Sequence, residues 1–422
     1  MTSVYPSPHC EHPLDYEPGG LHPVHIGDIF ANGRYEVMDK LGFGYSSTIW
    51  LVRDLTTATY ASLKILEARR TVSPTELVVL KHLEATFNAE EEGSKHVVRM
   101  LDHFVHEGPN GAHMCIVQEL LVPALAVDIV MYDGHSCLPV ATASRIVGQL
   151  LLAVDYLHKR GIAHGDLHSG NILVCLPPTF DLEVDFRKPI KQARGLPTEL
   201  SPHRPQYLVV PIGPRLPASF LRSCLSKPSI KLCDFSESYM IGMTEPPCFA
   251  SPHFLRPPEG ILDEILHATP ETDIWALAVA IYHILTSGCG LFSINDDHDY
   301  ILASMVLVLG KFPEPLWVSW TGRGKFLDEN ADPVPNAIGP VTSLSNKVEC
   351  WLCDEKQTPA LTAMLDSMLR YEAKARSTAS DIVHSQWMEN FCRPYMGEDV
   401  VLPIERRKIQ PNIVNITPQT TA

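Results

Sequence analysis

Short alternating and β-branched runs dominate the chain between residues 35 and 120. Such runs favour strands, and they cover 35–41, 48–52, 60–66 and 114–117. Within this region, 76–83 has helical spacing, with apolar residues three positions apart. We therefore expect residues 35–120 to form a small sheet with one main helix.

Helical spacing takes over after residue 120. The segment 142–158 places its apolar residues on one stripe, the pattern of an amphipathic helix, whereas 273–285 is apolar nearly all round, as in a core helix. Residues 360–370 and 378–388 are also predicted to be helical. The pattern therefore predicts an α+β fold with two lobes, a β-rich N-lobe and a mainly α-helical C-lobe.

In other parts of the chain the apolar residues do not recur at the spacing of a helix or a strand. Prolines, histidines and glycines are frequent before residue 35, and prolines are frequent in 176–229. The predicted organisation is an irregular arm over 1–34, the N-lobe over 35–120, the C-lobe over 121–392 with a proline-rich insert at 176–229, and a tail over 393–422.

Composition is that of a globular protein, with 45% hydrophobic and 20% charged residues among 422, and a net charge of −15. Such a charge repels nucleic acid and attracts basic partners, although solubility alone explains it equally well. The longest apolar run, 301–309, is too short to cross a bilayer, and the N-terminus has no targeting pattern. We expect no direct nucleic-acid or membrane partner, a monomer, and a location in the cytoplasm or nucleus.

The spacing of cysteines and histidines gives little support for a metal site. Cys350 and Cys353 form a single CxxC without a second pair, so chance spacing of thiols is the better interpretation. The pairs His9/His12 and His22/His25 have a spacing that suits a metal on a helix, but neighbouring prolines argue against a helix there.

A glycine-containing segment, 41–50, lies between the first two predicted strands. Glycines allow a backbone to approach phosphates closely, although an ordinary hairpin is the commoner explanation of two glycines. Lys64 ends the next strand-like run, and an amine on an apolar strand requires a partner, which Glu76 on the following helix can provide. Lys64 would then hold the α- and β-phosphates of ATP; the alternative is a surface lysine on an edge strand.

Two later segments supply oxygen atoms. Asp166 and Asn171 are five positions apart on one predicted loop, and Asp234 ends an apolar strand. A carboxylate can accept the proton of a substrate hydroxyl, and amide and carboxylate oxygens suit Mg²⁺. Asp234 has the alternative of capping a strand end. Taken together, the order of these parts is that of an ATP–Mg²⁺ phosphoryl-transfer site: glycine segment, Lys64, Glu76, Asp166, Asn171, Asp234.

This order of motifs resembles that of the eukaryotic protein kinases over residues 35–392. Arg256-Pro257-Pro258-Glu259 is similar to the Ala-Pro-Glu that ends the kinase activation segment, and Asp273-Ile274-Trp275-Ala276 is similar to the start of the central helix. The segment 371–376 resembles one whose arginine pairs with the Ala-Pro-Glu glutamate. The resemblance implies a bilobal kinase fold and an ion pair between Glu259 and Arg376.

Within the kinases, the chain resembles the SR-protein kinase family, and its expanded fungal branch in particular. The similarity lies in the glycine segment, in 101–113, and in the 63 positions between Asn171 and Asp234, where this family carries a spacer. Membership implies serine/threonine specificity, ATP and Mg²⁺ as cofactors, basic Arg/Ser-rich protein substrates and a role in regulating mRNA splicing.

The resemblance also assigns site residues. The residues implied for catalysis are Asp166 as base, His168, Lys64 and Asn171, and those implied for the metal are Asn171 and Asp234. The residues implied for the nucleotide are Leu41, Gly42, Gly44, Ser47, Ile49, Lys64, Glu76, Glu119, Leu121 and Asp234, with Gln118 as gatekeeper.

Three positions depart from the kinase pattern. Gly165 replaces an arginine that binds a phosphorylated activation loop, so we expect activity without that phosphorylation. His168 stands where a lysine usually contacts the γ-phosphate, and an imidazole is a weaker donor that titrates near about pH 6.5. Ser236 replaces the last glycine of Asp-Phe-Gly, and serine tolerates positive φ less readily.

Other functions stay open at this point. His-Gly-Asp-Leu-His also resembles small-molecule kinases, which lack the Pro-Glu segment found here, and a pseudokinase that acts through binding alone is a further alternative. The acidic stretches 295–299 and 328–332 are candidate docking sites for a basic peptide, and solvated loops are their alternative.

Overall fold

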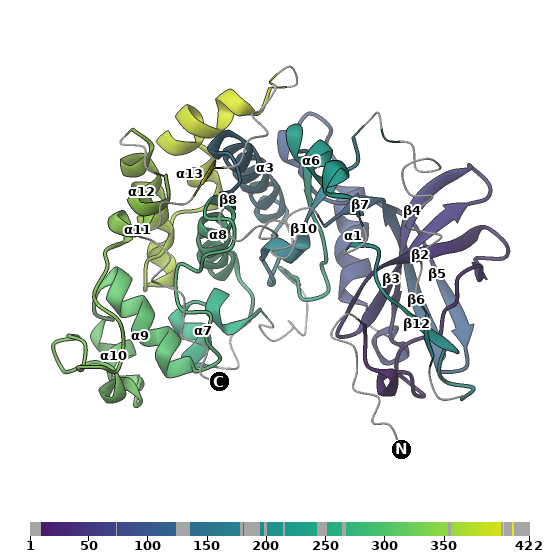
Figure 1. Cartoon of the computed structure of the whole chain (residues 1–422), viewed down its shortest axis with the longest axis horizontal. Coiled ribbons are helices and arrows are strands. Elements are labelled where there is room, and N and C mark those ends of the chain that lie inside the picture. The colour runs from purple at the N-terminus through teal and green to yellow at the C-terminus, as the bar shows by residue number, and fades with distance from the viewer. Residues whose placement is uncertain are drawn as a thin grey trace. The chain divides into compact units, whose positions relative to one another are not determined.

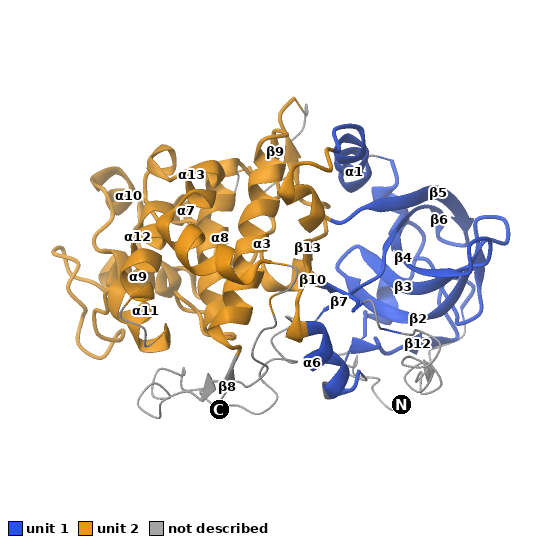
Figure 2. Ribbon diagram, turned by 90° about the horizontal axis from the view of Figure 1, so that it is seen from above, with its two compact units in different colours: residues 1–87, 98–123, 174–224 blue, residues 88–97, 124–173, 225–422 orange. Residues whose placement is uncertain are grey.

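The computed structural model describes residues 10–72, 74–123, 136–177, 180, 195–197, 201–213, 216–242, 251–263, 267–352, 356–397, 400 and 407–408. Parts of the predicted arm, insert and tail, together with His9 and Cys353, lie outside these residues. The chain forms two compact units, each made of several stretches (Figure 2). The first contains 1–87, 98–123 and 174–224, and the second contains 88–97, 124–173 and 225–422.

A six-stranded antiparallel sheet forms the centre of the first unit (Figure 1). Its strands are β1 (Ile29–Phe30), β2 (Tyr35–Gly44), β3 (Ser47–Asp54), β4 (Thr59–Leu66), β5 (Met100–Gly108) and β6 (Gly111–Glu119), in the order β1-β2-β3-β4-β6-β5. The four predicted runs fall in β2, β3, β4 and β6, and their inward residues, among them Trp50, Leu63 and Val117, are buried together. The predicted helix is α1 (Thr75–Ala85), and two short 3-10 helices are η1 (Pro13–Asp15) and η2 (Ala68–Arg70).

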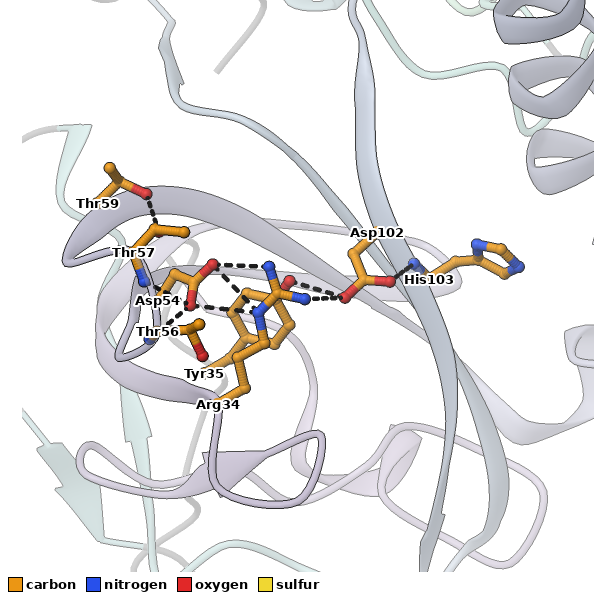
Figure 3. Close-up of polar contacts among 8 residues, drawn as sticks. All are labelled: Arg34, Tyr35, Asp54, Thr56, Thr57, Thr59, Asp102 and His103. Carbon is orange, nitrogen blue, oxygen red and sulfur yellow. Dashed lines mark hydrogen bonds and ion pairs between the residues drawn. The ribbon is translucent and has the colours of Figure 1, made fainter.

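An arginine fastens one end of this sheet (Figure 3). Arg34 Nη2 lies 2.9 Å from Asp54 Oδ2 at the end of β3, and Arg34 Nη1 lies 2.9 Å from Asp102 Oδ2 in β5. The Tyr35 hydroxyl donates to the same Asp102 oxygen at 2.8 Å. The hydrogen bond from Arg34 lowers the pKa of Asp54 to about 2. One guanidinium, on the residue before β2, thus joins β3 to β5 through paired donors, a geometry that arginine favours.

Residues 10–34 pack against the sheet. Val24 and Phe30 belong to its buried core, and Cys10, Tyr16 and Leu21 form a second buried cluster with Leu208. Backbone hydrogen bonds continue the packing, since Gly27 N–H donates to Val37 O at 2.8 Å. The arm therefore contributes core residues to the first unit.

The described residues of the insert up to Cys224 belong to the same unit. Its β12 (Tyr207–Val209) pairs with β11 (Gly195–Pro197), and Val209 enters the core of the sheet. Ile212 N–H donates to Lys40 O at 2.8 Å, so the insert bonds directly to β2. The Asn110 amide joins arm and insert, because its Nδ2 donates to Leu21 O at 2.6 Å and to His203 O at 2.9 Å.

Helices dominate the second unit (Figure 1). They are α3 (Val140–His158), α7 (Pro258–Leu262), α8 (Pro270–Leu285), α9 (His298–Leu309), α10 (Glu314–Ser319), α11 (Leu344–Leu352), α12 (Gln357–Met368) and α13 (Ala379–Val383). Helix α6 (Ala218–Ser226) lies within the insert, and its residues 218–224 belong to the first unit. The shorter helices are η3 (Glu92–His96), η4 (Ser169–Asn171), η6 (His253–Leu255), η7 (Arg323–Lys325), η8 (Ala373–Ala375), the π-helix η9 (Met388–Cys392) and η10 (Arg393–Tyr395). The short strands of the second unit are β8 (Ser136–Cys137), β9 (Ile162–Ala163), β13 (Ile230–Leu232), β14 (Tyr239–Met240) and β15 (Arg407–Lys408). Strand β7 (Leu121–Val122) belongs to the first unit, as do the last two residues of β10 (Ile172–Cys175).

The predicted core helices are α3 and α8. Within the described residues α3 is the one helix long and apolar enough to cross a membrane, and 89% of its apolar window is buried inside the protein, as in a core helix. A capping box at Thr269 and a proline at Pro270 start α8 three residues before the predicted boundary. The predicted helix 378–388 is shorter, since α13 ends at Val383 and the chain resumes as the π-helix η9.

Candidate active site

Lys64 and Glu76 form an ion pair inside the first unit. Lys64 lies on β4 between Ile49 of β3 and Ile116 of β6, so apolar strands flank it. Its Nζ is 2.7 Å from Glu76 Oε2, and the side chains are 6% and 2% exposed. Glu76 sits in the first turn of α1, where the helix dipole favours a carboxylate. The expected partner of Lys64 is therefore confirmed.

The glycine segment forms the hairpin between β2 and β3. Gly44 pairs with Ser47 and Gly42 with Ile49, and Tyr45 at the turn is 94% exposed. Neither glycine has a positive φ. A Cβ placed on Gly42 would meet no atom within 4 Å, and one on Gly44 would come no closer than 3.7 Å to Ser47 Oγ. Within the described residues, the fold itself does not require glycine at either position.

The predicted hinge follows β6. Ser62 Oγ donates to Gln118 O and to Glu119 O, each at 3.3 Å, and Arg99 N–H donates to the Glu119 side chain at 2.9 Å. Leu121 lies on β7 opposite Cys175 of β10.

In the second unit, Asp273 holds the backbone at the start of the loop 164–171, which carries Asp166 and Asn171. Asp273 lies in the first turn of α8, and its carboxylate accepts the N–H of His164 at 2.6 Å and the N–H of Gly165 at 2.9 Å. His158 Nε2 lies 3.0 Å from the same carboxylate. Asp273 is 1% exposed, so these charge-assisted bonds are shielded from water.

Gly165 has a conformation that other residues adopt with difficulty. Its φ is +79°, and a Cβ there would lie 2.2 Å from Glu237 O. A side chain at this position would therefore have to displace backbone. In this chain, the lack of space for a side chain therefore explains why glycine, and not the arginine usual in kinases, stands at position 165.

One carboxylate oxygen of Asp166 makes hydrogen bonds, and the other makes none with the described residues. Oδ2 lies 3.3 Å from His168 Nε2 and accepts a hydrogen bond from Asn171 Nδ2 at 3.2 Å. Oδ1 is buried and has no hydrogen-bond partner among the described residues. Burial raises the pKa of Asp166, but the hydrogen bond from His168 and the other interactions of the carboxylate outweigh it, so the pKa lies below its ordinary value.

Asp234 is fastened next to Asn171. Cys233 N–H donates to Asn171 O at 2.9 Å, and Cys233 O lies 3.0 Å from His164 Nε2. Asp234 itself has a φ of +65°, an unfavourable conformation of the kind that clusters at functional sites. Ser236 does not have a positive φ, so the expected difficulty at that residue does not arise in this conformation.

Both described ends of the expected activation segment bond to the loop 164–171, which carries Asp166 and Asn171. Ser238 Oγ donates to His164 O at 2.9 Å, and Ser251 Oγ donates to Gly165 O at 2.8 Å. Both serines are fully buried. No sequence signal indicated these two hydroxyls, because a serine in a loop is ordinarily a solvated residue.

The predicted pair of Glu259 and Arg376 is confirmed. Arg376 Nη2 lies 2.6 Å from Glu259 Oε1, and the Arg376 side chain is fully buried. Its other nitrogens donate to the carbonyls of Arg370 and Glu271. The guanidinium thereby links the helix after the activation segment, α7, to the start of α8.

The acidic stretches are largely engaged within the protein. Asp297 caps α9, and Asp299 accepts hydrogen bonds from Lys325 at 2.7 Å and from Trp320 at 2.8 Å. Asp328 accepts the N–H groups of Asn330 and Asp332. These contacts stabilise local loops and leave fewer acidic groups for a basic peptide than the sequence suggested.

The described residues hold no cluster of three or more His, Cys, Asp or Glu side chains arranged for a metal ion. His22 instead packs against His106 and His113, with ring centroids 4.6 and 4.9 Å away. The amide nitrogen of Asn171 donates hydrogen bonds to Asp166, so the amide oxygen of Asn171 points away from Asp166. Oxygen donors on Asn171 and Asp234 are the type that Mg²⁺ prefers.

Three comparisons with known proteins each find protein kinases. A protein kinase domain model matches residues 35–182. The protein kinase dsk1 of Schizosaccharomyces pombe is 42% identical over 171 residues, which are 40% of this chain and 31% of that protein. The serine/threonine-protein kinase SRPK of Physarum polycephalum is 27% identical over 403 residues, 89% of this chain and 90% of that protein. A crystal structure of a kinase domain superposes with a TM-score of 0.60 at 18% identity, covering 86% of this chain and 98% of that one.

Proposed function

The chain belongs to the SR-protein kinase family, and we propose from this membership that it transfers the γ-phosphate of ATP to serine or threonine in Arg/Ser-rich proteins. The observation that carries the proposal is the state of Asp166, a carboxylate held through Oδ2 whose buried Oδ1 has no partner among the described residues. A buried acceptor left open costs free energy unless a ligand uses it.

Asp166 Oδ1 is suited to accept the proton of the substrate hydroxyl. The depressed pKa keeps the carboxylate ionised at neutral pH, so it can take the proton as the oxygen attacks phosphorus. Asn171 Nδ2 fixes the carboxylate from the other side of the loop. The loop itself is held by Asp273 through two backbone N–H groups.

The first unit supplies the nucleotide-binding residues in this proposal. Lys64, directed by Glu76, binds the α- and β-phosphates. Gly42 and Gly44, which the fold does not require, permit the hairpin backbone to approach the phosphates. Leu41 and Ile49 flank the hairpin, Ser47 follows its turn, and the backbone of Glu119 and Leu121 bonds the adenine edge.

Asn171 and Asp234 would hold Mg²⁺, which neutralises charge on the phosphates when bound. Their donors are amide and carboxylate oxygens, and the backbone bond from Cys233 to Asn171 keeps the two residues adjacent. Cys233, the residue before Asp234, is held on both sides, its N–H by Asn171 O and its carbonyl oxygen by the His164 ring.

The net charge of −15 favours a basic substrate, and the Physarum polycephalum relative is named an SRPK. An Arg-Ser repeat peptide, a Lys-Ser repeat and a Glu-Ser repeat of equal length test the substrate class with radiolabelled ATP. We expect transfer to the Arg-Ser peptide to exceed the other two by at least roughly tenfold, since guanidinium pairs with carboxylates more specifically than ammonium does. Equal labelling of all three would contradict the substrate class, and label on tyrosine in a protein mixture would contradict the specificity.

A further inference from the structure

His168 uses both ring nitrogens within the catalytic loop. Gly170 N–H donates to Nδ1 at 3.0 Å, and Nε2 lies 3.3 Å from Asp166 Oδ2. A backbone N–H can only donate, so Nδ1 must be the acceptor and carry no proton. A neutral imidazole then has its single hydrogen on Nε2, directed at Asp166.

This arrangement differs from what a lysine would do at the same position. An ammonium has three hydrogens and can bond a carboxylate and a phosphate at the same time. The neutral imidazole has one N–H, and Asp166 takes it. No donor of His168 is then left for a phosphate oxygen.

Two donors converge on one oxygen of Asp166. His168 Nε2 and Asn171 Nδ2 both reach Oδ2, at 3.3 and 3.2 Å, while Oδ1 has no partner among the described residues. A carboxylate bonded by two donors on one side has a restricted χ2, which fixes the direction of the other oxygen. The ring of His168 therefore helps determine where Oδ1 points.

We propose that His168 is a positioning residue for the base Asp166 and does not contact the γ-phosphate; the inference rests on the proposed function. In its Nε2–H tautomer, His168 holds Oδ2 and presents Oδ1 to the substrate hydroxyl. Its contribution is to the chemical step and not to the binding of ATP.

Gly170 provides an independent way to disturb the ring. A Cβ on Gly170 would lie 2.7 Å from Cε1 and 2.8 Å from Nδ1 of His168. Gly170→Ala therefore displaces the imidazole without changing its chemistry. It tests the position of the ring, whereas substitution of His168 tests its hydrogen bonds.

The decisive comparison is between His168→Ala and His168→Gln, assayed for transfer to an Arg-Ser peptide at saturating peptide. A glutamine amide has an oxygen that can accept and an N–H that can donate, so it can replace both bonds. We expect kcat of His168→Gln to stay within about threefold of wild type, and kcat of His168→Ala and Gly170→Ala to fall roughly tenfold to a hundredfold. The KM for ATP should change by less than about twofold in all three. His384→Ala, which removes an exposed histidine of the second unit, is the matched control and should change neither constant.

A second readout is independent of activity. Long-range ¹H–¹⁵N NMR of the folded wild type, with the His168 signal assigned by its loss in His168→Gln, should show protonated Nε2 and unprotonated Nδ1. Melting temperatures near that of wild type establish that each variant is folded.

The outcomes separate the inference from the proposed function. If wild type transfers phosphate and His168→Gln loses as much kcat as His168→Ala, or if the KM for ATP rises roughly tenfold in both, His168 contacts the phosphate and the inference is wrong. An Nδ1–H tautomer in the NMR spectrum would overturn it as well. If wild type transfers no phosphate at all, the proposed function fails and this inference fails with it.

Discussion

Lys40 and Glu11 form an ion pair in the interior of the first unit, with side chains 0% and 2% exposed. The Tyr16 hydroxyl donates to the same carboxylate, and burial outweighs Glu11 in lowering the pKa of Lys40. Lys40 lies on β2, the strand that carries Gly42 and Gly44, whereas Glu11 belongs to the arm. The arm is thereby attached to the strand that leads into the glycine hairpin.

Removing one partner of this pair should destabilise the first unit strongly. Glu11→Gln leaves the Lys40 ammonium buried without a counter-charge, and we expect a loss of about 3–5 kcal/mol in the free energy of unfolding. The double variant Lys40→Met/Glu11→Leu, which removes both charges, should recover most of that loss. Urea denaturation followed by circular dichroism measures the difference, and a double variant no more stable than Glu11→Gln would contradict the account.

Gly165 should tolerate no side chain. Gly165→Ala places a Cβ at 2.2 Å from Glu237 O in a residue with φ of +79°, so we expect a loss of about 2–4 kcal/mol together with most of the activity. Gly242→Ala is the matched control, because Gly242 has a φ of +97° but a Cβ placed on it would meet no atom within 4 Å. Its cost should be limited to about 1 kcal/mol of backbone strain. Equal melting temperatures of the two variants would show that the contact with Glu237 is unimportant.

Activity should not depend on phosphorylation of the activation segment. Ser251 Oγ anchors that segment to Gly165 O without a phosphate, so phosphatase-treated protein should retain its rate of peptide phosphorylation. Ser251→Ala leaves the Gly165 carbonyl without this donor and should lower kcat roughly tenfold, equivalent to about 1–2 kcal/mol. A treated protein that is inactive until it is phosphorylated again would refute the expectation.

Acid should destabilise the first unit through its buried histidines. Burial, followed by the charges of His106 and His113, lowers the pKa of His22 from 6.5 to about 3. The unfolded chain therefore binds a proton between about pH 6.5 and 3 that the folded chain does not, so stability is present above pH 6.5 and is lost as pH falls. The slope is about 1.4 kcal/mol per pH unit for each such group. The free energy of unfolding of wild type and of His22→Phe is measured between pH 7 and 4. We expect its slope against pH to be smaller in His22→Phe by the contribution of about one proton, about 1.4 kcal/mol per pH unit. An unchanged slope would exclude this role of His22.

Much of the fold and of the site follows from local pattern. Strands β2, β3, β4 and β6 and helices α3 and α8 have strong periods, and their positions were predicted from these periods alone. The pairs Lys64–Glu76 and Glu259–Arg376 were predicted because each joins motifs of fixed order, and both are present. Such features are encoded over a few residues or in a familiar succession of segments.

The packing of the arm and the insert could not be predicted in this way. Cys10 and Val209, which are in contact, lie 199 positions apart, and each stands in a segment without a period. Val209 lies in the short apolar run 207–210 and Ile212 follows Pro211, and neither belongs to a periodic pattern that would indicate which surface it covers. The tautomer of His168 was equally hidden, because it depends on a hydrogen bond from Gly170 that appears only when the loop is folded.

The central claim is that Asp166 performs the chemistry while other residues bind the nucleotide, and Asp166→Ala tests it most directly. Wild type and Asp166→Ala are compared for ATP–Mg²⁺-dependent rise in melting temperature and for phosphate transfer to an Arg-Ser peptide. We predict that both proteins are stabilised by the nucleotide to a similar extent and that transfer by Asp166→Ala falls at least roughly a hundredfold. Transfer by Asp166→Ala at the wild-type rate, or a wild type that binds ATP without transferring phosphate, would contradict the account.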